Sequence, residues 1–232
     1  MELQGRHAVI TGGTGVLGTA VVGRLLEAGA VCHVPCRSAA QAARFPYRDR
    51  PGVTLVMVED LADEAGVERF YAALPSLWAS IHVAGGFAYG PVATTDKAAL
   101  LAQLDQNLVS CFLCCRAALK AMPEGAGGRI VNVAARPALE WRSGANMAAY
   151  AASKAAVAAL TVALAQEVAA KNILVNAVAP SIIDTPANRR DMPNADHAAW
   201  PKPEAIAEII CGLASPANQV ARGAIVPVYG RA

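Results

Sequence analysis

Short apolar runs alternate with longer segments of helical periodicity along almost the whole chain. Apolar runs of this length between turn residues are typical of buried strands, and a period near 3.6 is typical of helices. The runs predict strands over His7–Thr11, Val31–Cys36, Val53–Val58, Ser80–Ala84, Arg129–Ala134, Ile173–Val178 and Ala224–Val228. The intervening segments predict helices over Val16–Ala28, Asp63–Leu74, Ala98–Met122, Ala148–Ala170 and Pro203–Ala214.

This alternation predicts one α/β domain over residues 1–232. Strands that are separated by helices pair in parallel through right-handed crossovers. We therefore expect a Rossmann-type, doubly wound, seven-stranded parallel sheet with helices on both faces. Only Asp184–Trp200, which is rich in Pro, Asn and charged residues, interrupts the alternation, and we interpret it as an insertion above the sheet.

Composition agrees with this fold and excludes several kinds of partner. Hydrophobic residues make up 55% of the chain and aromatic residues only 5%, which suits aliphatic helices packed on a buried parallel sheet. A formal charge of +2 gives no electrostatic case for binding nucleic acid. No secretory signal precedes the first predicted strand, and no uncharged apolar run reaches the roughly 18 residues of a membrane span. We expect a cytoplasmic protein without a membrane or nucleic-acid partner.

The six cysteines are expected to be reduced core residues. Cys32 and Cys36 fall in or beside a predicted strand, and Cys111, Cys114 and Cys115 lie on a predicted apolar helix. None of the four histidines stands at metal-ligand spacing from them in the sequence. We therefore expect no metal site.

A glycine-rich turn, Thr11–Gly18, lies between the first predicted strand and the first predicted helix. A turn in this position receives a dinucleotide pyrophosphate, because the helix N-terminus presents free N–H groups to it. In a doubly wound sheet the ligand lies outside the carboxyl ends of the strands. The other predicted strand ends carry unusual residues too, namely Arg37, Asp60, Gly85-Gly86, Ala134-Ala135 and Pro180. Together they predict a dinucleotide site at one rim.

A second motif places a phenol and an ammonium one helical turn apart. Tyr150 and Lys154 are separated by four positions and share one face of a predicted helix. A phosphate cradle and a proton donor in the same chain predict hydride transfer.

With these motifs the chain resembles the short-chain dehydrogenase/reductase family, in its compact single-domain branch, over almost its whole length. The matching positions are Thr11–Gly18, Asp60-Leu61, Ala84-Gly85-Gly86, Asn107, Tyr150, Lys154, Pro180 and Thr185. The resemblance implies NAD(P)-dependent redox activity on a small-molecule substrate.

The resemblance also implies roles for individual residues. Tyr150 would be the general acid/base, Lys154 would favour the phenolate and grip the nicotinamide ribose, and Asn107 would hold a proton-relay water near the lysine. Because a free phenol titrates near 10, the lysine charge is expected to lower the Tyr150 pKa. The expected cofactor contacts are Gly12, Thr14, Gly15, Val16, Leu17, Gly18, Arg37, Ser38, Asp60, Leu61, Ala84, Gly85, Gly86, Tyr150, Lys154, Pro180, Ile183 and Thr185.

One departure from the family pattern bears on activity. Ala135 stands nearest the position where the family usually has a serine within hydrogen-bond reach of the substrate carbonyl, and Ser143 is not an obvious replacement. Losing one such donor typically costs about 2.7–4 kcal/mol. Two alternatives to a carbonyl/alcohol oxidoreductase therefore stay open. One is an enzyme similar to dihydropteridine reductases, which share the glycine loop and lack the serine; the other is a weakly active or non-catalytic dinucleotide-binding protein.

A smaller departure concerns His82, which lies in the segment that replaces the family's usual Asn-Asn-Ala-Gly. We interpret His82 as filling that position in the fold rather than binding a metal.

The end of the second predicted strand bears on the choice of cofactor. An acidic residue there selects NAD through the ribose 2′-hydroxyl, whereas an arginine accommodates a 2′-phosphate. Cys36 occupies the acid position, and Arg37 and Ser38 follow it. A planar guanidinium suits phosphate, so we expect NADP(H), with NAD as the alternative.

Two further expectations concern the surface. The helices near 98–122 and 148–170 are apolar over more than one stripe, which predicts a homodimer or homotetramer built on them. Asp184–Trp200 is expected to be a mobile lid over the nicotinamide, with Ile183 and Thr185 at its root. The outer wall of the substrate pocket would then consist of Trp141, Arg142 and Trp200.

Overall fold

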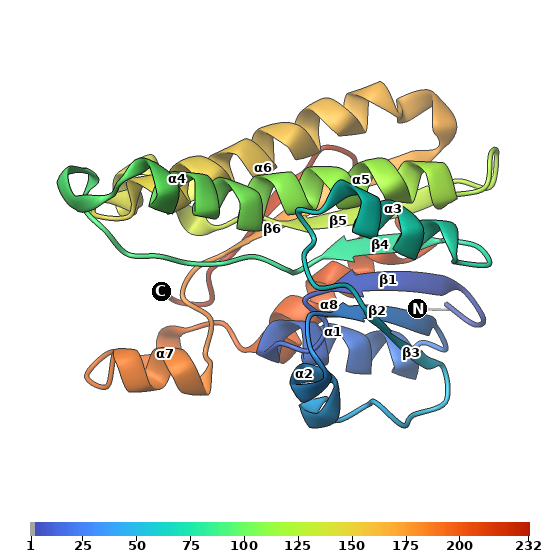
Figure 1. Ribbon diagram of the computed structural model, residues 1–232, viewed down its shortest axis with the longest axis horizontal. Coiled ribbons are helices and arrows are strands. Elements are labelled where there is room, and N and C mark those ends of the chain that lie inside the picture. Colours follow the sequence, from blue (N-terminus) through green and yellow to red (C-terminus); the bar gives the residue numbers. More distant parts are fainter. Residues whose placement is uncertain (1–2) are drawn as a thin grey trace.

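Seven parallel strands form one sheet in the computed structural model, which describes residues 3–232 (Figure 1). The strand order β3-β2-β1-β4-β5-β6-β7 confirms the doubly wound class. The chain builds outward from β1 in one direction, returns, and continues from β4 in the other, so the order reverses between β1 and β4. The strands are His7–Thr11 (β1), Val31–Cys36 (β2), Val53–Met57 (β3), Ala79–His82 (β4), Gly128–Val133 (β5), Ile173–Pro180 (β6) and Ile225–Val228 (β7).

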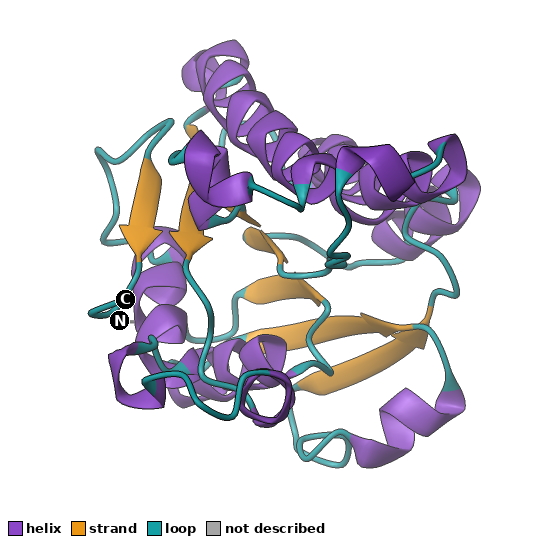
Figure 2. Cartoon of the chain, turned by 90° about the vertical axis from the view of Figure 1, so that its left-hand side faces the viewer, coloured by secondary structure: helices purple, strands orange, loops and turns teal. Residues whose placement is uncertain are grey.

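Helices cover both faces of the sheet (Figures 1 and 2). One layer is formed by Val16–Glu27 (α1), Ala39–Arg44 (α2) and Pro203–Ala214 (α8). The other is formed by Glu64–Ala72 (α3), Lys97–Leu104 (α4), Ser110–Ala121 (α5) and Ala148–Glu167 (α6). Each layer buries an apolar cluster against the sheet, the first around Val21 and Ile210 and the second around Phe70 and Leu164. A short helix, Pro186–Asp191 (α7), projects at the end of the molecule where the strands terminate.

The central strands are buried on both faces, as parallel sheets require. Every residue of β5 and β6 is buried, including Asn132 on β5. The register pairs His82 of β4 with Asn132, so both side chains point to the same face of the sheet. The α5 layer covers that face, because α5 packs on both β4 and β5.

The structure corrects the single helix expected over 98–122. A π-helical turn, Asp105–Val109, separates α4 from α5. Helical periodicity in a sequence does not resolve one extra residue in a turn, so the pattern predicted a continuous helix. Two short helices, α2 and α7, were also not predicted, because neither has a buried residue that would mark an apolar stripe.

Two helical stretches, Lys97–Ala121 and Ala148–Glu167, are long and apolar enough to cross a membrane by length and composition alone. In the fold both pack on the sheet, with α5 against β4 and α6 against β6. The second also carries Lys154 near its start. We therefore interpret them as core helices of the α/β domain.

Candidate active site

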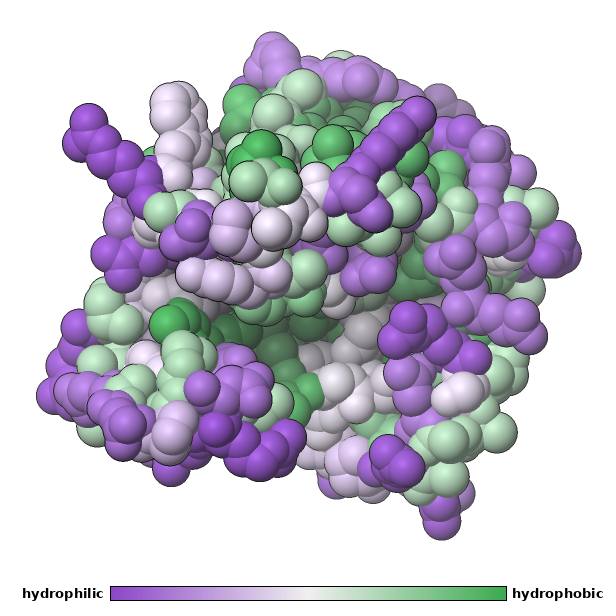
Figure 3. Space-filling model, turned by 60° about the vertical axis from the view of Figure 1, so that its left-hand side comes forward, coloured by the Kyte–Doolittle hydropathy of each residue, from purple (hydrophilic) through white to green (hydrophobic). Residues whose placement is uncertain are grey.

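A cavity of about 600 Å³ opens at the carboxyl ends of the strands, where the strand order reverses. Figure 3 shows the molecule hollowed between two lobes on this side, with apolar side chains on the floor. Fourteen of the expected contact residues line it: Gly12, Thr14, Gly15, Val16, Leu17, Gly18, Arg37, Asp60, Leu61, Ala84, Gly85, Gly86, Ile183 and Thr185. Ser38, Tyr150, Lys154 and Pro180 do not line the cavity.

The glycine loop is shaped by close contact between chain segments. Gly12 has φ +66°, and a Cβ there would lie 2.7 Å from the backbone nitrogen of Ala84 on the neighbouring strand end. A Cβ on Gly18 would overlap the carbonyl oxygen of Gly12, so only glycine lets α1 approach the loop. Helix α1 begins without a side-chain cap and without an acidic residue in its first turn. Its free N–H groups and dipole therefore face the cavity as an anion site.

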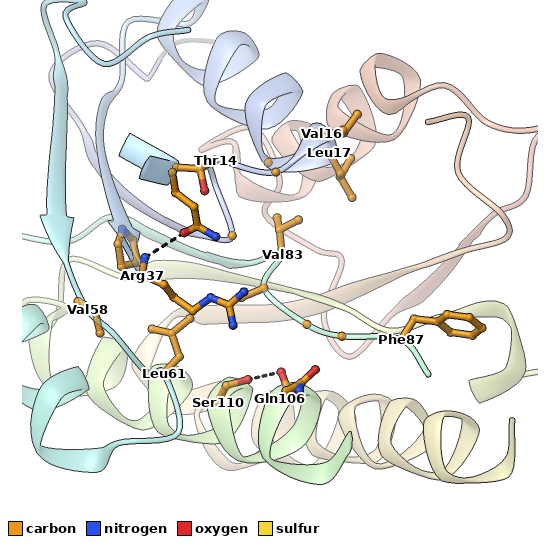
Figure 4. Close-up of a pocket in the computed structure, with 18 of the residues that line it drawn as sticks. Thr14, Val16, Leu17, Arg37, Val58, Leu61, Val83, Phe87, Gln106 and Ser110 are labelled. Atoms are coloured by element: carbon orange, nitrogen blue, oxygen red, sulfur yellow. Dashed lines mark hydrogen bonds between the residues drawn. The ribbon is translucent and has the colours of Figure 1, made fainter. Parts of the chain in front are cut away.

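Arg37 follows β2 and extends its side chain into the pocket, as Figure 4 shows. Its backbone N–H donates to Oε1 of Gln41 at 3.0 Å. The guanidinium is exposed and has no hydrogen-bond or ion-pair partner among residues 3–232. The Ser38 hydroxyl caps α2 by accepting from the Gln41 backbone N–H at 3.3 Å. Arg37 is thus placed for a charged group on the ligand, whereas the Ser38 oxygen is already used as an acceptor.

Tyr150 and Lys154 lie on one face of α6 beside this cavity. The half-buried Tyr150 ring makes an edge-to-face contact with Phe87, which lines the cavity, at 4.9 Å between ring centroids. The Lys154 side chain is buried, and its Nζ donates to the Val133 carbonyl at 2.8 Å. No hydrogen bond joins Tyr150 to Lys154 within residues 3–232.

Burial perturbs both titrating groups. Loss of hydration raises the pKa of Tyr150 to about 12 and lowers the pKa of Lys154 to about 8. The expected lowering of the Tyr150 pKa by the lysine is therefore wrong for this arrangement, because the ammonium is directed to Val133 rather than to the phenol.

Asn107 ties the π-helical turn to the end of β4. Its amide oxygen accepts from the Gly86 N–H at 2.9 Å, and its amide nitrogen donates to the Gly86 carbonyl and to the Ser153 hydroxyl, both at 3.0 Å. The side chain is only 1% exposed. Asn107 therefore fixes the Gly85-Gly86 wall of the cavity against α6. This wall lies close to Lys154, because a Cβ on Gly85 would be 3.2 Å from the lysine Nζ.

The position expected to hold a serine carries no replacement donor. Ala135 is buried, and the hydroxyl of the exposed Ser143 donates to the Glu140 carbonyl at 2.8 Å. The residues expected to form the outer wall also differ from that expectation. Trp141 and Arg142 are exposed, Trp200 is buried against His197, and none of the three lines the cavity.

The cavity also contains residues that the sequence did not single out. They come from α2, the segment after β4, the π-helical turn and the start of α5, and include Gln41, Phe87, Asp105, Gln106 and Ser110. Figure 4 shows Gln106 and Ser110 facing the pocket from the helix opposite α1. The helical periodicity carried no signal for them, because the π-helical turn decides which side of the helix faces the ligand.

All six cysteines are buried and free. His82 lies directly against two of them: its Nδ1 is 3.9 Å from the sulfur of Cys111 and 3.5 Å from that of Cys115. The contact joins residues about 30 positions apart and depends on which helix covers β4.

The fold and the cavity define a dinucleotide-binding α/β protein with a buried lysine and a tyrosine beside its ligand site. The family model for short chain dehydrogenases matches residues 6–196. The chain belongs to this family, whose members are NAD(P)-dependent oxidoreductases.

Similar proteins cover nearly the whole chain. Galactitol 2-dehydrogenase of Rhizobium johnstonii is 34% identical over 98% of this chain and 95% of its own length. Cis-4-hydroxycyclohexanecarboxylate dehydrogenase of Sinomonas cyclohexanicum is 35% identical over 97% of this chain and 95% of its own. Among solved structures, a blue fluorescent protein from a metagenomic library, in complex with NADPH, superimposes with a TM-score of 0.88 at 28% identity, covering 99% of this chain and 98% of that protein.

Proposed function

We propose that this protein is an NADP(H)-dependent oxidoreductase that transfers a hydride to or from a small carbonyl or alcohol substrate. Tyr150 is the general acid/base, Lys154 is its electrostatic partner, and Asn107 positions the Gly85-Gly86 wall of the cavity against α6. The observation that carries this proposal is the position of Tyr150 against Phe87, which lines a dinucleotide-sized cavity, with the buried Lys154 one helical turn away.

The choice of NADP(H) rests on Arg37. The second strand ends without an acidic residue, and the free guanidinium of Arg37 extends into the cavity, where it suits a 2′-phosphate. The structural relative with bound NADPH supports the same choice.

The protein's own groups handle the proton. NADPH, when bound, supplies the hydride for the substrate carbon. A phenol whose pKa is raised to about 12 is protonated at neutral pH, so Tyr150 is ready to donate its proton to the substrate oxygen in the direction of reduction. In the direction of oxidation Tyr150 must accept a proton, which requires the Lys154 ammonium to be directed towards the phenol instead of the Val133 carbonyl.

Ala135 narrows the substrate class. Because Ala135 has no hydroxyl, it cannot add a second hydrogen bond to the substrate oxygen or nitrogen beside that from the Tyr150 phenol. This favours substrates that are already activated, and it keeps a quinonoid dihydropterin as a second candidate substrate.

The remaining parts of the proposal concern the surface. Apolar side chains are exposed on α4, α5 and α6, which supports a homodimer or homotetramer built on these helices; they are Leu100, Leu101, Phe112 and Val162.

Asp184–Trp200 is proposed as the lid, because Ile183 and Thr185 line the cavity at its root. A cytoplasmic location completes the proposal.

The test is Tyr150→Phe, which removes only a hydroxyl. Turnover, followed as NADPH consumption over a panel of aldehydes, ketones and a quinonoid dihydropterin, is expected to fall by about 10²–10⁴-fold on any substrate that the wild type reduces. NADPH affinity, measured by calorimetry, should stay within about twofold of the wild-type value. A twofold change in affinity corresponds to less than about 1 kcal/mol of binding free energy. A variant that retains wild-type turnover would refute the assignment of Tyr150.

A further inference from the structure

A cluster of metal-ligating side chains lies inside the second apolar core, and none of its members lines the cavity. His82 comes from β4, and Cys111 and Cys115 come from successive turns of α5. All three side chains are buried, and their nitrogen and sulfur donor atoms lie within 4.8 Å of one another. The i,i+4 spacing puts both sulfurs on the helix face that covers the histidine.

The spacing of these atoms matches a tetrahedral zinc site. Nδ1 of His82 lies 3.9 Å from the Cys111 sulfur and 3.5 Å from the Cys115 sulfur. A tetrahedral site with a Zn–S distance of about 2.3 Å and a Zn–N distance of 2.0–2.1 Å places its donor atoms roughly 3.5–3.8 Å apart, which both nitrogen–sulfur distances approach. The two sulfurs lie within 4.8 Å of each other and must come closer where they exceed that spacing. A small inward movement of the side chains is enough to bring an ion into contact with all three.

A fourth donor borders the same space. Oδ1 of Asn132 lies 2.8 Å from Nδ1 of His82 and 3.6 Å from the Cys115 sulfur. The amide nitrogen of Asn132 donates to the Thr161 hydroxyl at 2.9 Å, which orients the oxygen towards the cluster. Oδ1 can therefore change from hydrogen-bond acceptor to metal ligand without rotation of the amide.

In the absence of a metal, Nδ1 of His82 carries the ring proton and donates it to Oδ1 of Asn132 at 2.8 Å, so metal binding must move that proton to Nε2. Nε2 of His82 lies 2.8 Å from the Ser80 hydroxyl, which lies 2.8 Å from the Tyr71 hydroxyl. When Nε2 carries the proton and donates it to Ser80, the lone pair of Nδ1 faces the two sulfurs. Metal-bound histidines commonly donate their other ring N–H to such a partner, which fixes the orientation of the ring.

We propose that His82, Cys111, Cys115 and the side-chain oxygen of Asn132 bind one zinc ion that stabilises the fold. Binding releases the two thiol protons, and the resulting thiolates balance the charge of Zn²⁺, so the cluster enters the apolar core without net charge. Two thiolates and an imidazole select zinc over Mg²⁺ and Ca²⁺, which require oxygen ligands. The ion would join β4, β5 and α5 next to Val133, whose carbonyl holds Lys154.

The first experiment uses the wild-type protein. After expression in zinc-supplemented medium and gel filtration, elemental analysis is expected to find one zinc per chain. Co²⁺ refolded into the metal-free protein should give thiolate-to-cobalt charge-transfer absorption and the ligand-field bands of a tetrahedral site. Wild-type protein with neither bound zinc nor these bands would overturn the proposal, as would selective binding of Cu(I) with no affinity for zinc.

Matched cysteine variants locate the ion. Cys111→Ser and Cys115→Ser should lose the zinc, whereas Cys114→Ser should keep it, because Cys114 is buried in the same helix but contacts Tyr71 instead of His82. Chelator treatment should lower the thermal midpoint of the wild type and of Cys114→Ser, and leave Cys115→Ser unchanged. Equal zinc content in all three variants would place the ion elsewhere and refute the assignment. The cobalt spectrum of the wild type tests the site even if a variant fails to fold.

Discussion

One side of the cavity is built mainly from backbone, and the other depends on buried polar side chains. On the side of β1, α1 and β2 the wall is backbone, with Gly12 and Gly18 bringing segments into close contact and the first turn of α1 left uncapped. On the side of α5 and α6 the important groups are side chains withdrawn from water, chiefly Asn107 and Lys154. The first side is therefore sensitive to added volume, and the second to changes in charge and hydrogen bonding.

Both sides of the cavity lower the free energy of unfolding. On the first side the loss is spread over several glycines, and on the second it is concentrated in one lysine. Each glycine of the loop costs about 0.5–1 kcal/mol of backbone entropy, spread over several positions. On the other side, burial lowers the pKa of Lys154 from 10.5 to about 8, a shift that corresponds to about 3 kcal/mol in one residue. A single substitution can remove the second cost, but no single substitution can remove the first.

Lys154→Met should give the largest effect and separate activity from stability. Turnover is expected to fall by about 100-fold or more, because the charge that assists Tyr150 is lost. At pH 7 the free energy of unfolding should nevertheless rise by about 1–3 kcal/mol, since the desolvation of a buried ammonium disappears along with its hydrogen bond to Val133. Steady-state kinetics and urea denaturation measure the two changes.

The pH dependence identifies the source of that stability gain. The unfolded chain binds more protons than the folded protein between the folded Lys154 pKa of about 8 and the unfolded value of 10.5, so wild-type stability rises with pH there. Cys111 is the titratable neighbour, and its negative form partly opposes the shift. The advantage of Lys154→Met should therefore be complete below pH 8, and because it falls by about 3 kcal/mol by pH 10.5 it should then be lost or reversed. A difference that does not vary with pH would contradict this explanation.

Gly18→Ala tests the backbone side by volume alone. The added methyl group overlaps the Gly12 carbonyl, so α1 must move away from the loop and its N–H groups lose their position. Overpacking of this kind costs about 1–3 kcal/mol, and NADPH affinity should fall roughly tenfold to hundredfold. The matched control is Gly212→Ala in α8, where a Cβ meets nothing within 4 Å. It should leave NADPH affinity unchanged and raise stability by up to about 1 kcal/mol.

Arg37→Ala should have the smallest effect, because Arg37 is an exposed side chain on the otherwise backbone-built side. A charge-assisted hydrogen bond contributes about 1.5–3 kcal/mol, and solvent exposure keeps this one near the lower value, so NADPH affinity should fall about tenfold while NADH affinity is unchanged. Arg44→Ala, at the end of the short helix that follows Arg37 and outside the cavity, serves as the control. Calorimetric titration of both cofactors distinguishes the two, and equal losses for NADPH and NADH would show that Arg37 does not recognise the 2′-phosphate.

Features set by neighbouring residues were predictable from the sequence. The bounds of β1 and β2 agree with prediction because their apolar runs end at the glycine loop and at Arg37. The glycine loop itself is a local motif, and it lies in the cavity as expected. The helix α2 was missed because six residues without a buried side chain produce no periodic pattern.

Features set by strand order and helix phase were not predictable. The contact of His82 with Cys115 requires β4 to lie beside β5 and α5 to cover that face, and neither fact is encoded locally. The spacing of Tyr150 and Lys154 was visible, but the direction of the ammonium towards Val133 depends on how α6 packs against the end of β5. The sequence therefore identified Tyr150 and Lys154 on the side of α5 and α6, but not the direction in which the burial of each shifts its pKa.

The π-helical turn Asp105–Val109 makes the fold more sensitive to the number of residues in this segment than to their identities. An α-helix advances by about 100° per residue, and a π-helical turn takes up one extra residue, so α5 is rotated by about that angle relative to an uninterrupted continuation of α4. Deleting one residue would restore a regular helix, yet it would also turn either Asn107 away from Gly86 or the cysteine face of α5 away from β4. Single-residue insertions and deletions in this segment should therefore destabilise the fold even at positions where point substitutions are tolerated.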